Sequence, residues 1–143
     1  MKSYDETACS VPEHILLGKQ GEDAAMDLLE QSGFRVLARN WRKGRLELDL
    51  VCKDADTIVF VEVKTRLAEG MSTPADAITP AKQRMVTRAA QAWIAANNAW
   101  QRPCRFDVVC VLHNGKTFCA EHYRNAFDFS PALGRGNTAW QPW

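Results

Sequence analysis

The sequence predicts an α/β fold, in which a mixed β-sheet carries a helix on each face. Two long segments have apolar residues at helical spacing, residues 14–32 and 79–98. Segments rich in β-branched and aromatic residues lie between and after them, at 34–41, 45–52, 58–65, 105–112 and 117–123. We therefore expect the order α-β-β-β-α-β-β, which is typical of a layered α/β architecture.

Both expected helices carry end signals. The first is followed by Gly33, a residue type that often ends a helix in the left-handed conformation. The second begins at Thr79 and Pro80, which suit the N-cap and the first helical position. Trp93 lies on the apolar stripe of this helix and is expected in the core.

Two hairpins are expected among the strands. Residues 54–57 have turn chemistry and join 45–52 to 58–65, and Asn114-Gly115 predicts a tight turn between the last two strands. With a two-residue turn there, Cys110 would lie opposite Cys119, and we expect both to be reduced core residues rather than a disulfide.

Length and composition indicate one globular domain of 143 residues, with 46% apolar and 24% charged residues. We expect a flexible N-terminus at 1–13, the domain at 14–129 and a polar tail at 130–143. No apolar run suits a membrane span or a signal peptide, so we expect a cytoplasmic protein with no membrane partner. The five cysteines lack a C-x-x-C pair, which disfavours a zinc ribbon.

The net charge of +1 conceals a segregated distribution. Residues 33–45 contain Arg42, Lys43 and Arg45 among five basic residues and no acid. Residues 79–98 add Lys82, Arg84 and Arg88, again without an acid. Such segregation is typical of a basic nucleic-acid-binding face, and equally of a solvated surface.

Carboxylates are expected to meet across the first hairpin. A turn centred on residues 55–56 places Leu48 opposite Val63 and Leu50 opposite Val61, so that one face is apolar. On the other face Asp49 lies opposite Glu62, and Glu47 lies opposite Lys64. Opposed like charges repel, and a divalent cation such as Mg²⁺ removes the conflict.

Lys64 leaves the same face as Glu62 and could orient a water or stabilise charge on a phosphate. Two carboxylates and a lysine suit metal-assisted phosphodiester hydrolysis. An exposed ladder of Glu and Lys is the alternative. Ile58 and Phe60 share this face, however, which indicates that it is partly covered.

The pattern D-x(n)-(D/E)-x-K on a hairpin resembles the PD-(D/E)xK nuclease superfamily, which includes restriction endonucleases and Holliday-junction resolvases. The ordered stretches "GKQGEDAAMDLLEQSGFRVLARNWR", "LELDLV", "VFVEVKTR", "TPAKQRMVTRAAQAW", "RFDVVCV" and "RNAF" resemble the YraN-like family of small bacterial proteins more closely. The resemblance implies a restriction-endonuclease-like αβββαβ core with an extra C-terminal hairpin strand. This sequence departs from the family in having Leu46, rather than Gly, before Glu47.

The resemblance also implies roles. Asp49, Glu62 and the carbonyl oxygen of Val63 would bind Mg²⁺ or Mn²⁺, and Lys64 would position the attacking water. Glu22 matches a helix glutamate beside the metal, although an exposed first-turn charge is an equal alternative. Glu47 matches an acid next to the metal-binding Asp and would pair with Lys64.

Further residues are candidates for contacts with nucleic acid. Lys82 or Gln83 could reach the site from the second helix, although a capping or surface role is the alternative for both. The other candidates are basic: Arg42, Lys43, Arg45, Arg66 and Arg84. Trp41 could stack on a base or belong to the core, and Asp107 is expected to pair with an arginine.

We therefore expect a Mg²⁺- or Mn²⁺-dependent endonuclease acting on DNA, branched or single-stranded. A symmetric branched substrate would suit a homodimer. The alternatives are a non-catalytic nucleic-acid-binding module on the same fold and a protein-interaction role for the Trp-bearing tail.

Overall fold

The computed structural model describes residues 17–67, 78–113 and 116–127, and it confirms the predicted order of elements. The expected N-terminal segment 1–13, most of the connection 66–78, and the tail 130–143 with Trp140 and Trp143 lie outside the described residues. The elements are α2 (Leu17–Gln31), β1 (Arg35–Lys43), β2 (Leu46–Asp54), β3 (Thr57–Leu67), α3 (Pro80–Ala96), β4 (Cys104–His113) and β5 (Phe118–Phe127).

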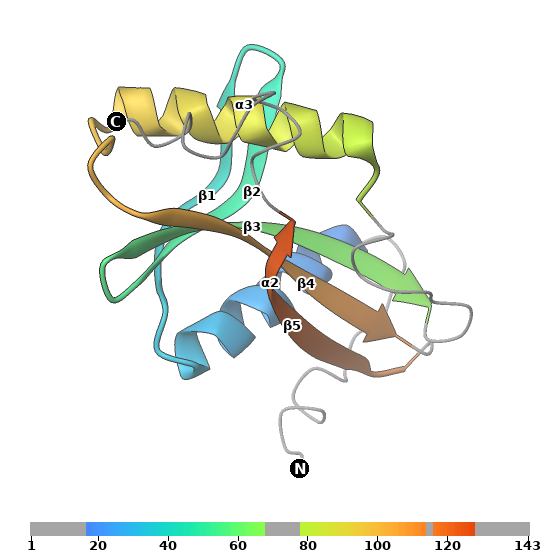
Figure 1. The fold of residues 1–143 in the computed structure, drawn as a ribbon. Coiled ribbons are helices and arrows are strands. Elements are labelled where there is room, and N and C mark those ends of the chain that lie inside the picture. Colours follow the sequence, from blue (N-terminus) through green and yellow to red (C-terminus); the bar gives the residue numbers. More distant parts are fainter. Residues whose placement is uncertain (1–16, 68–77, 114–115, 128–143) are drawn as a thin grey trace.

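The strands form one five-stranded mixed sheet in the order β1-β2-β3-β4-β5. Neighbours are antiparallel except β3 and β4, which are parallel. A parallel pair needs a crossover connection, and α3 lies in that connection, across one face of the sheet, with α2 across the other (Figure 1). The expected mixed sheet with a helix on each face is confirmed.

Each helix covers its own hydrophobic core. The core under α3 includes Phe60, Phe106 and Trp93, which confirms the expected place of this tryptophan. The core under α2 includes Leu29 and Val61. Because alternate residues of β3 enter opposite cores, this strand is apolar on both faces, as its sequence indicates.

The helix ends follow the sequence signals. Gly33 has φ of 97°, a left-handed conformation that is costly for other residues, and the Phe34 N–H bonds to the Leu29 carbonyl at 2.9 Å. Thr79 is the N-cap of α3, where its Oγ1 accepts the Lys82 N–H at 3.1 Å, and Pro80 follows as the first helical residue. The start of α3 is therefore fixed by local chemistry.

The register between β2 and β3 is as predicted from Asp54–Thr57 to Leu50–Val61, where the pairing ends. The expected Leu48–Val63 pair is wrong, because Leu48 packs into the core under α3 whereas Val63 packs against the core under α2. Leu50 lies in the core under α2, so the strict alternation of faces along β2 breaks at Asp49. The two strands separate at this point.

The second hairpin differs from the prediction. His113 pairs with Phe118 and Leu112 with Cys119, so the connection spans four residues rather than two. Cys110 consequently pairs with Glu121, and its expected position opposite Cys119 is wrong. The longer loop lets Phe118 enter the core under α2, where it is 3% exposed. Cys110 is buried, as expected of a core residue, whereas Cys119 is exposed, so its expected place in the core is wrong.

Within the described part of the chain, both helices are too short and too polar to span a lipid bilayer.

Candidate active site

The separation of β2 from β3 brings the two predicted carboxylates together. In place of a ladder bond, the Val63 N–H donates to Asp49 Oδ2 at 2.8 Å. The Asp49 N–H in turn donates to the Glu62 carboxylate. The carboxylate of each residue thus accepts a hydrogen bond from the backbone of the other strand. Asp49 and Glu62 lie together as the hairpin predicts, although the strands no longer form a regular ladder at this point.

Both carboxyl groups are held where ionisation is unfavourable. Glu62 is 4% exposed, and burial, followed by the negative charge of Asp49, raises its pKa from 4.5 to about 8. Burial also raises the pKa of Asp49, against the opposing effect of the Val63 N–H. Two adjacent acids that resist joint ionisation are a typical environment for a bound cation.

Lys82 reaches this pair from the first turn of α3. Its Nζ lies 3.6 Å from Glu62 Oε1, and its charge lowers the pKa of both carboxyl groups. Of the two roles considered for Lys82, the structure therefore supports a side chain that reaches into the site. Gln83 has a structural role instead, because its Nε2 donates to the carbonyl of Ile78 at 3.0 Å and so binds the residue that precedes the Thr79 cap.

Lys64 and Arg66 continue the face of Glu62 toward the end of β3. Both are half-buried, and each follows the previous one by two residues, so all three side chains leave the same side of the strand. Arg66 Nε is a buried atom that has no hydrogen-bond partner among the described residues. This face changes from apolar at Phe60 to a row of ionisable groups.

Glu22 approaches the site from α2. Its Oε1 accepts from Asn40 Nδ2 at 3.1 Å and lies 3.5 Å from Arg39 Nη2, and its charge contributes to the raised pKa of Asp49.

The residue that precedes Glu22, Gly21, explains how α2 comes so close to β3. A Cβ atom at this position would overlap the Thr65 hydroxyl, so only glycine lets α2 lie this close to β3.

Glu47 has a different partner from the one predicted. Its Oε2 lies 3.8 Å from Arg42 Nη2 across the β1–β2 pair, rather than beside Lys64. The physical reason is that the pairing of β2 with β3 begins at Leu50, so the residues of β2 before Leu50 do not face β3 directly. The charge of Glu47 still makes a small contribution to the raised pKa of Asp49.

The remaining basic candidates lie at the surface. Arg42, Lys43 and Arg45 are exposed at the connected ends of β1 and β2, and Arg84 is exposed on α3. Trp41 is partly buried and packs against the core under α3, which is its expected structural role.

The side chains present fit a cation that retains several waters. Among residues 17–67, 78–113 and 116–127 no three His, Cys, Asp or Glu side chains gather as a metal-binding group. Asp49 and Glu62 alone provide two carboxylates, the number that Mg²⁺ usually takes from a protein. The negative charge of Asp49 adds to burial in raising the pKa of Glu62, and this repulsion is the observation that favours a cation between them.

A second polar cluster surrounds Asp107, which lies on β4 opposite Val61 of β3. Asp107 is fully buried and accepts from Arg105 Nε at 2.9 Å and from the Asn125 N–H at 3.1 Å. His122 Nε2 lies 2.7 Å from its other oxygen. The pairing of Asp107 with an arginine is confirmed, whereas His122 gave no signal in the sequence because its partner lies on another strand.

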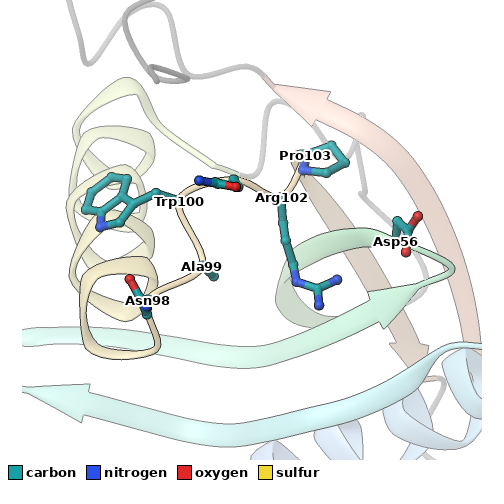
Figure 2. A pocket seen from close by; sticks show the side chains of 7 residues that line it. Asp56, Asn98, Ala99, Trp100, Arg102 and Pro103 are labelled. Carbon is teal, nitrogen blue, oxygen red and sulfur yellow. The ribbon is translucent and has the colours of Figure 1, made fainter.

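A surface hollow lies far from the carboxylates (Figure 2). It is lined by Asp56 of the β2–β3 turn and by residues 98–103, which include Trp100 and Arg102. Asn98 lies beyond Ala96, the last residue of α3, whereas Lys82 lies in its first turn, and the helix rise from Lys82 to Ala96 alone is about 21 Å. The hollow is therefore distinct from the carboxylate cluster.

The chain matches known sequences over most of its length. A model of the uncharacterised protein family UPF0102 matches residues 21–111. A UPF0102 protein of Nitratidesulfovibrio vulgaris (strain DP4) is 56% identical over 126 residues, which cover 88% of this chain and 94% of that protein. A UPF0102 protein of Lawsonia intracellularis is 46% identical over 127 residues, covering 89% and 96% of the two chains. One from Bacteroides fragilis (strain YCH46) is 44% identical, over 80% of this chain and 94% of that protein.

Proposed function

The chain belongs to the uncharacterised family UPF0102, and from that premise and the carboxylate cluster we propose that it is a divalent-metal-dependent nuclease that hydrolyses DNA. The relationship to the YraN-like family is thereby confirmed. Membership of the PD-(D/E)xK superfamily is part of the proposal.

One observation carries the proposal: a buried Glu62 and Asp49 are held against each other at the point where β2 and β3 separate. The pair has a lysine two residues further along β3 and a second lysine in ion-pair contact from α3. A protein that needed only stability would gain from apolar residues at such a position. The retained charges are therefore best explained by a ligand.

In this proposal Asp49 and Glu62 hold Mg²⁺ or Mn²⁺, with the Val63 carbonyl as a third ligand. The bound ion would supply charge stabilisation at the scissile phosphate and lower the pKa of a water. Lys64 positions the attacking water from the same face of β3. Glu22 is placed to hold a further water beside Asp49.

The exposed basic residues suit the phosphate backbone of the substrate. Arg42, Lys43 and Arg45 at the β1–β2 connection and Arg84 on α3 would bind phosphates without reading sequence. Branched or single-stranded DNA is the substrate class that we propose to test first. A homodimer is part of the proposal only for a symmetric branched substrate.

The test is cleavage of branched, single-stranded and duplex DNA in Mg²⁺ or Mn²⁺. We expect Asp49→Asn and Lys64→Met to lower the cleavage rate at least a hundredfold, because general acid–base groups and metal ligands contribute about 10²–10⁴-fold. Asp27→Asn, an exposed carboxylate on α2, is the matched control and should retain activity. Undiminished cleavage by Asp49→Asn would refute the assignment.

A non-catalytic nucleic-acid-binding module is the second candidate. The exposed basic residues favour it as much as they favour a nuclease. It predicts DNA binding that weakens steeply with salt and is indifferent to Asp49→Asn, with no metal-dependent cleavage.

A further inference from the structure

We propose that Lys82 is a built-in counter-ion of the carboxylate pair: in the metal-free protein its ammonium neutralises Glu62 once this carboxyl group has lost its proton, yields the carboxylate to a divalent cation, and so limits how tightly the cation is held. The inference rests on the proposed function in taking the cation to be the catalytic one.

The contact between the two residues is asymmetric. The side chain of Glu62 is 5% exposed, whereas that of Lys82 is 47% exposed. Their separation of 3.6 Å is that of an ion pair rather than of a short hydrogen bond. The carboxylate is thus fixed inside the protein, and the ammonium reaches it from the solvent side and can withdraw.

The backbone of Lys82 is anchored, whereas about half of its side chain is exposed to solvent. Its N–H is bound by Thr79 Oγ1 at 3.1 Å, and the next N–H, of Gln83, is bound by the Thr79 carbonyl at 2.8 Å. One turn later Val86 is buried at 1% exposure, which holds α3 on the sheet. The four-carbon stem can therefore swing its charge to and from Glu62 without movement of the helix.

The charges around the pair make Lys82 the relevant cation. The charges that raise the pKa of Asp49 come from Glu22 and Glu47, and the charge that lowers it comes from Lys82. For Glu62 the opposing charges are those of Asp49 and Lys82. Removal of the ammonium would leave a cluster of carboxylates with an unbalanced negative potential.

The sign of the effect distinguishes this role from a structural one. A variant that merely damaged the site would bind a divalent ion more weakly. Loss of a competing and repelling positive charge strengthens binding instead, by about threefold to tenfold for one charge next to a divalent ion in a water-accessible site. The direction of the change is therefore diagnostic.

The experiment is calorimetric titration of the chelator-treated full chain with MgCl₂, in the absence of DNA, for wild type and Lys82→Met. Methionine retains an unbranched stem and a good helix propensity. A buffer near pH 8.5 is used because a proton is the other ion that can occupy Glu62. Arg88→Met removes the same charge from an exposed position of α3 and is the matched control.

We expect Lys82→Met to bind Mg²⁺ about threefold to tenfold more tightly than wild type, and Lys82→Gln also to bind it more tightly. The Mg²⁺ affinities of Lys82→Arg and Arg88→Met should stay within about twofold of wild type. Unchanged or weaker binding by both neutral variants overturns the inference, and the nuclease assignment then stands if the wild type cleaves DNA. Absence of Mg²⁺ binding by the wild type overturns both.

Discussion

Replacement of Glu62 by glutamine is expected to stabilise the metal-free protein at alkaline pH and to abolish its response to Mg²⁺. Glutamine has nearly the shape of glutamate, but it cannot ionise beside Asp49. The folded wild type holds a proton on Glu62 up to a pKa of about 8, whereas the unfolded chain releases it near 4.5. The stability due to this proton is therefore complete below about pH 4.5 and is lost as the pH rises through 8.

The size of the effect follows from the same two values. At 1.36 kcal/mol per pKa unit, the step from 4.5 to about 8 corresponds to about 5 kcal/mol. At alkaline pH, entry of water and movement of Lys82 stabilise ionised Glu62 and reduce this penalty. We therefore expect the free energies of unfolding of wild type and Glu62→Gln to differ by about 2–3 kcal/mol at pH 9. At pH 5 the two proteins should have nearly equal free energies of unfolding.

Urea unfolding followed by tryptophan fluorescence, with EDTA present, measures this difference at each pH. Mg²⁺ at about 100 times its dissociation constant should then add about 2.7 kcal/mol to the wild type and nothing to the variant. Asp27→Asn on α2 is the control, since its exposed carboxylate lies outside the site and should affect neither measurement. Parallel pH profiles for wild type and Glu62→Gln, or an intact Mg²⁺ response in the variant, would refute this account of the site.

Two other changes test the framework of the fold. Asp107→Asn should lower the free energy of unfolding at pH 7 by about 3–5 kcal/mol in urea titrations, because it removes the fully buried carboxylate that pairs with Arg105 and leaves that guanidinium only the partly exposed Asp54 as an ionic partner. Burial opposes ionisation of Asp107, but hydrogen bonds from His122 and Arg105 outweigh burial and lower the pKa of this carboxyl group. The stability that ionised Asp107 contributes is therefore present above about pH 4 and should fade as the pH falls further. If Asp107→Asn lowered the free energy of unfolding as much at pH 2 as at pH 7, this explanation would be contradicted. Gly21→Ala should lower the melting temperature, since its methyl group meets the Thr65 hydroxyl and displaces α2 from β3, while Asp27→Ala on the exposed face of the same helix should not. Equal melting temperatures for the two variants would show that α2 does not depend on this close approach.

Local chemistry accounts for the parts of the structure that the sequence predicts. Thr79 and Pro80 start α3, Gly33 ends α2, and the 54–57 turn sets the pairing of Leu50 with Val61. Each of these features depends on residues a few positions apart. Their expected structure follows from backbone conformation and short-range hydrogen bonds, which need no knowledge of the rest of the chain.

The errors arise where long-range packing competes with a local pattern. Leu48 alternates with Asp49 in sequence, yet it enters the core under α3 because the residues of β2 before Leu50 do not pair with β3. Glu47 loses its expected neighbour for the same reason and pairs with Arg42. In the second hairpin, the burial of Phe118 outweighs the preference of Asn114-Gly115 for a two-residue turn.

The sequence by itself determined the order of helices and strands, the two-faced burial of β3 and the projection of Glu62 and Lys64 from one side of it. These depend on a repeat of two residues and on turn chemistry, both local properties. Only the tertiary structure decided which partner each charged side chain has. Asp49 accepts a hydrogen bond from the backbone of β3, Glu22 accepts one from Asn40, and Lys82 forms an ion pair with Glu62. Contacts between elements depend on sheet twist and on where the crossover helix lies, and many side chains distant in sequence determine these together.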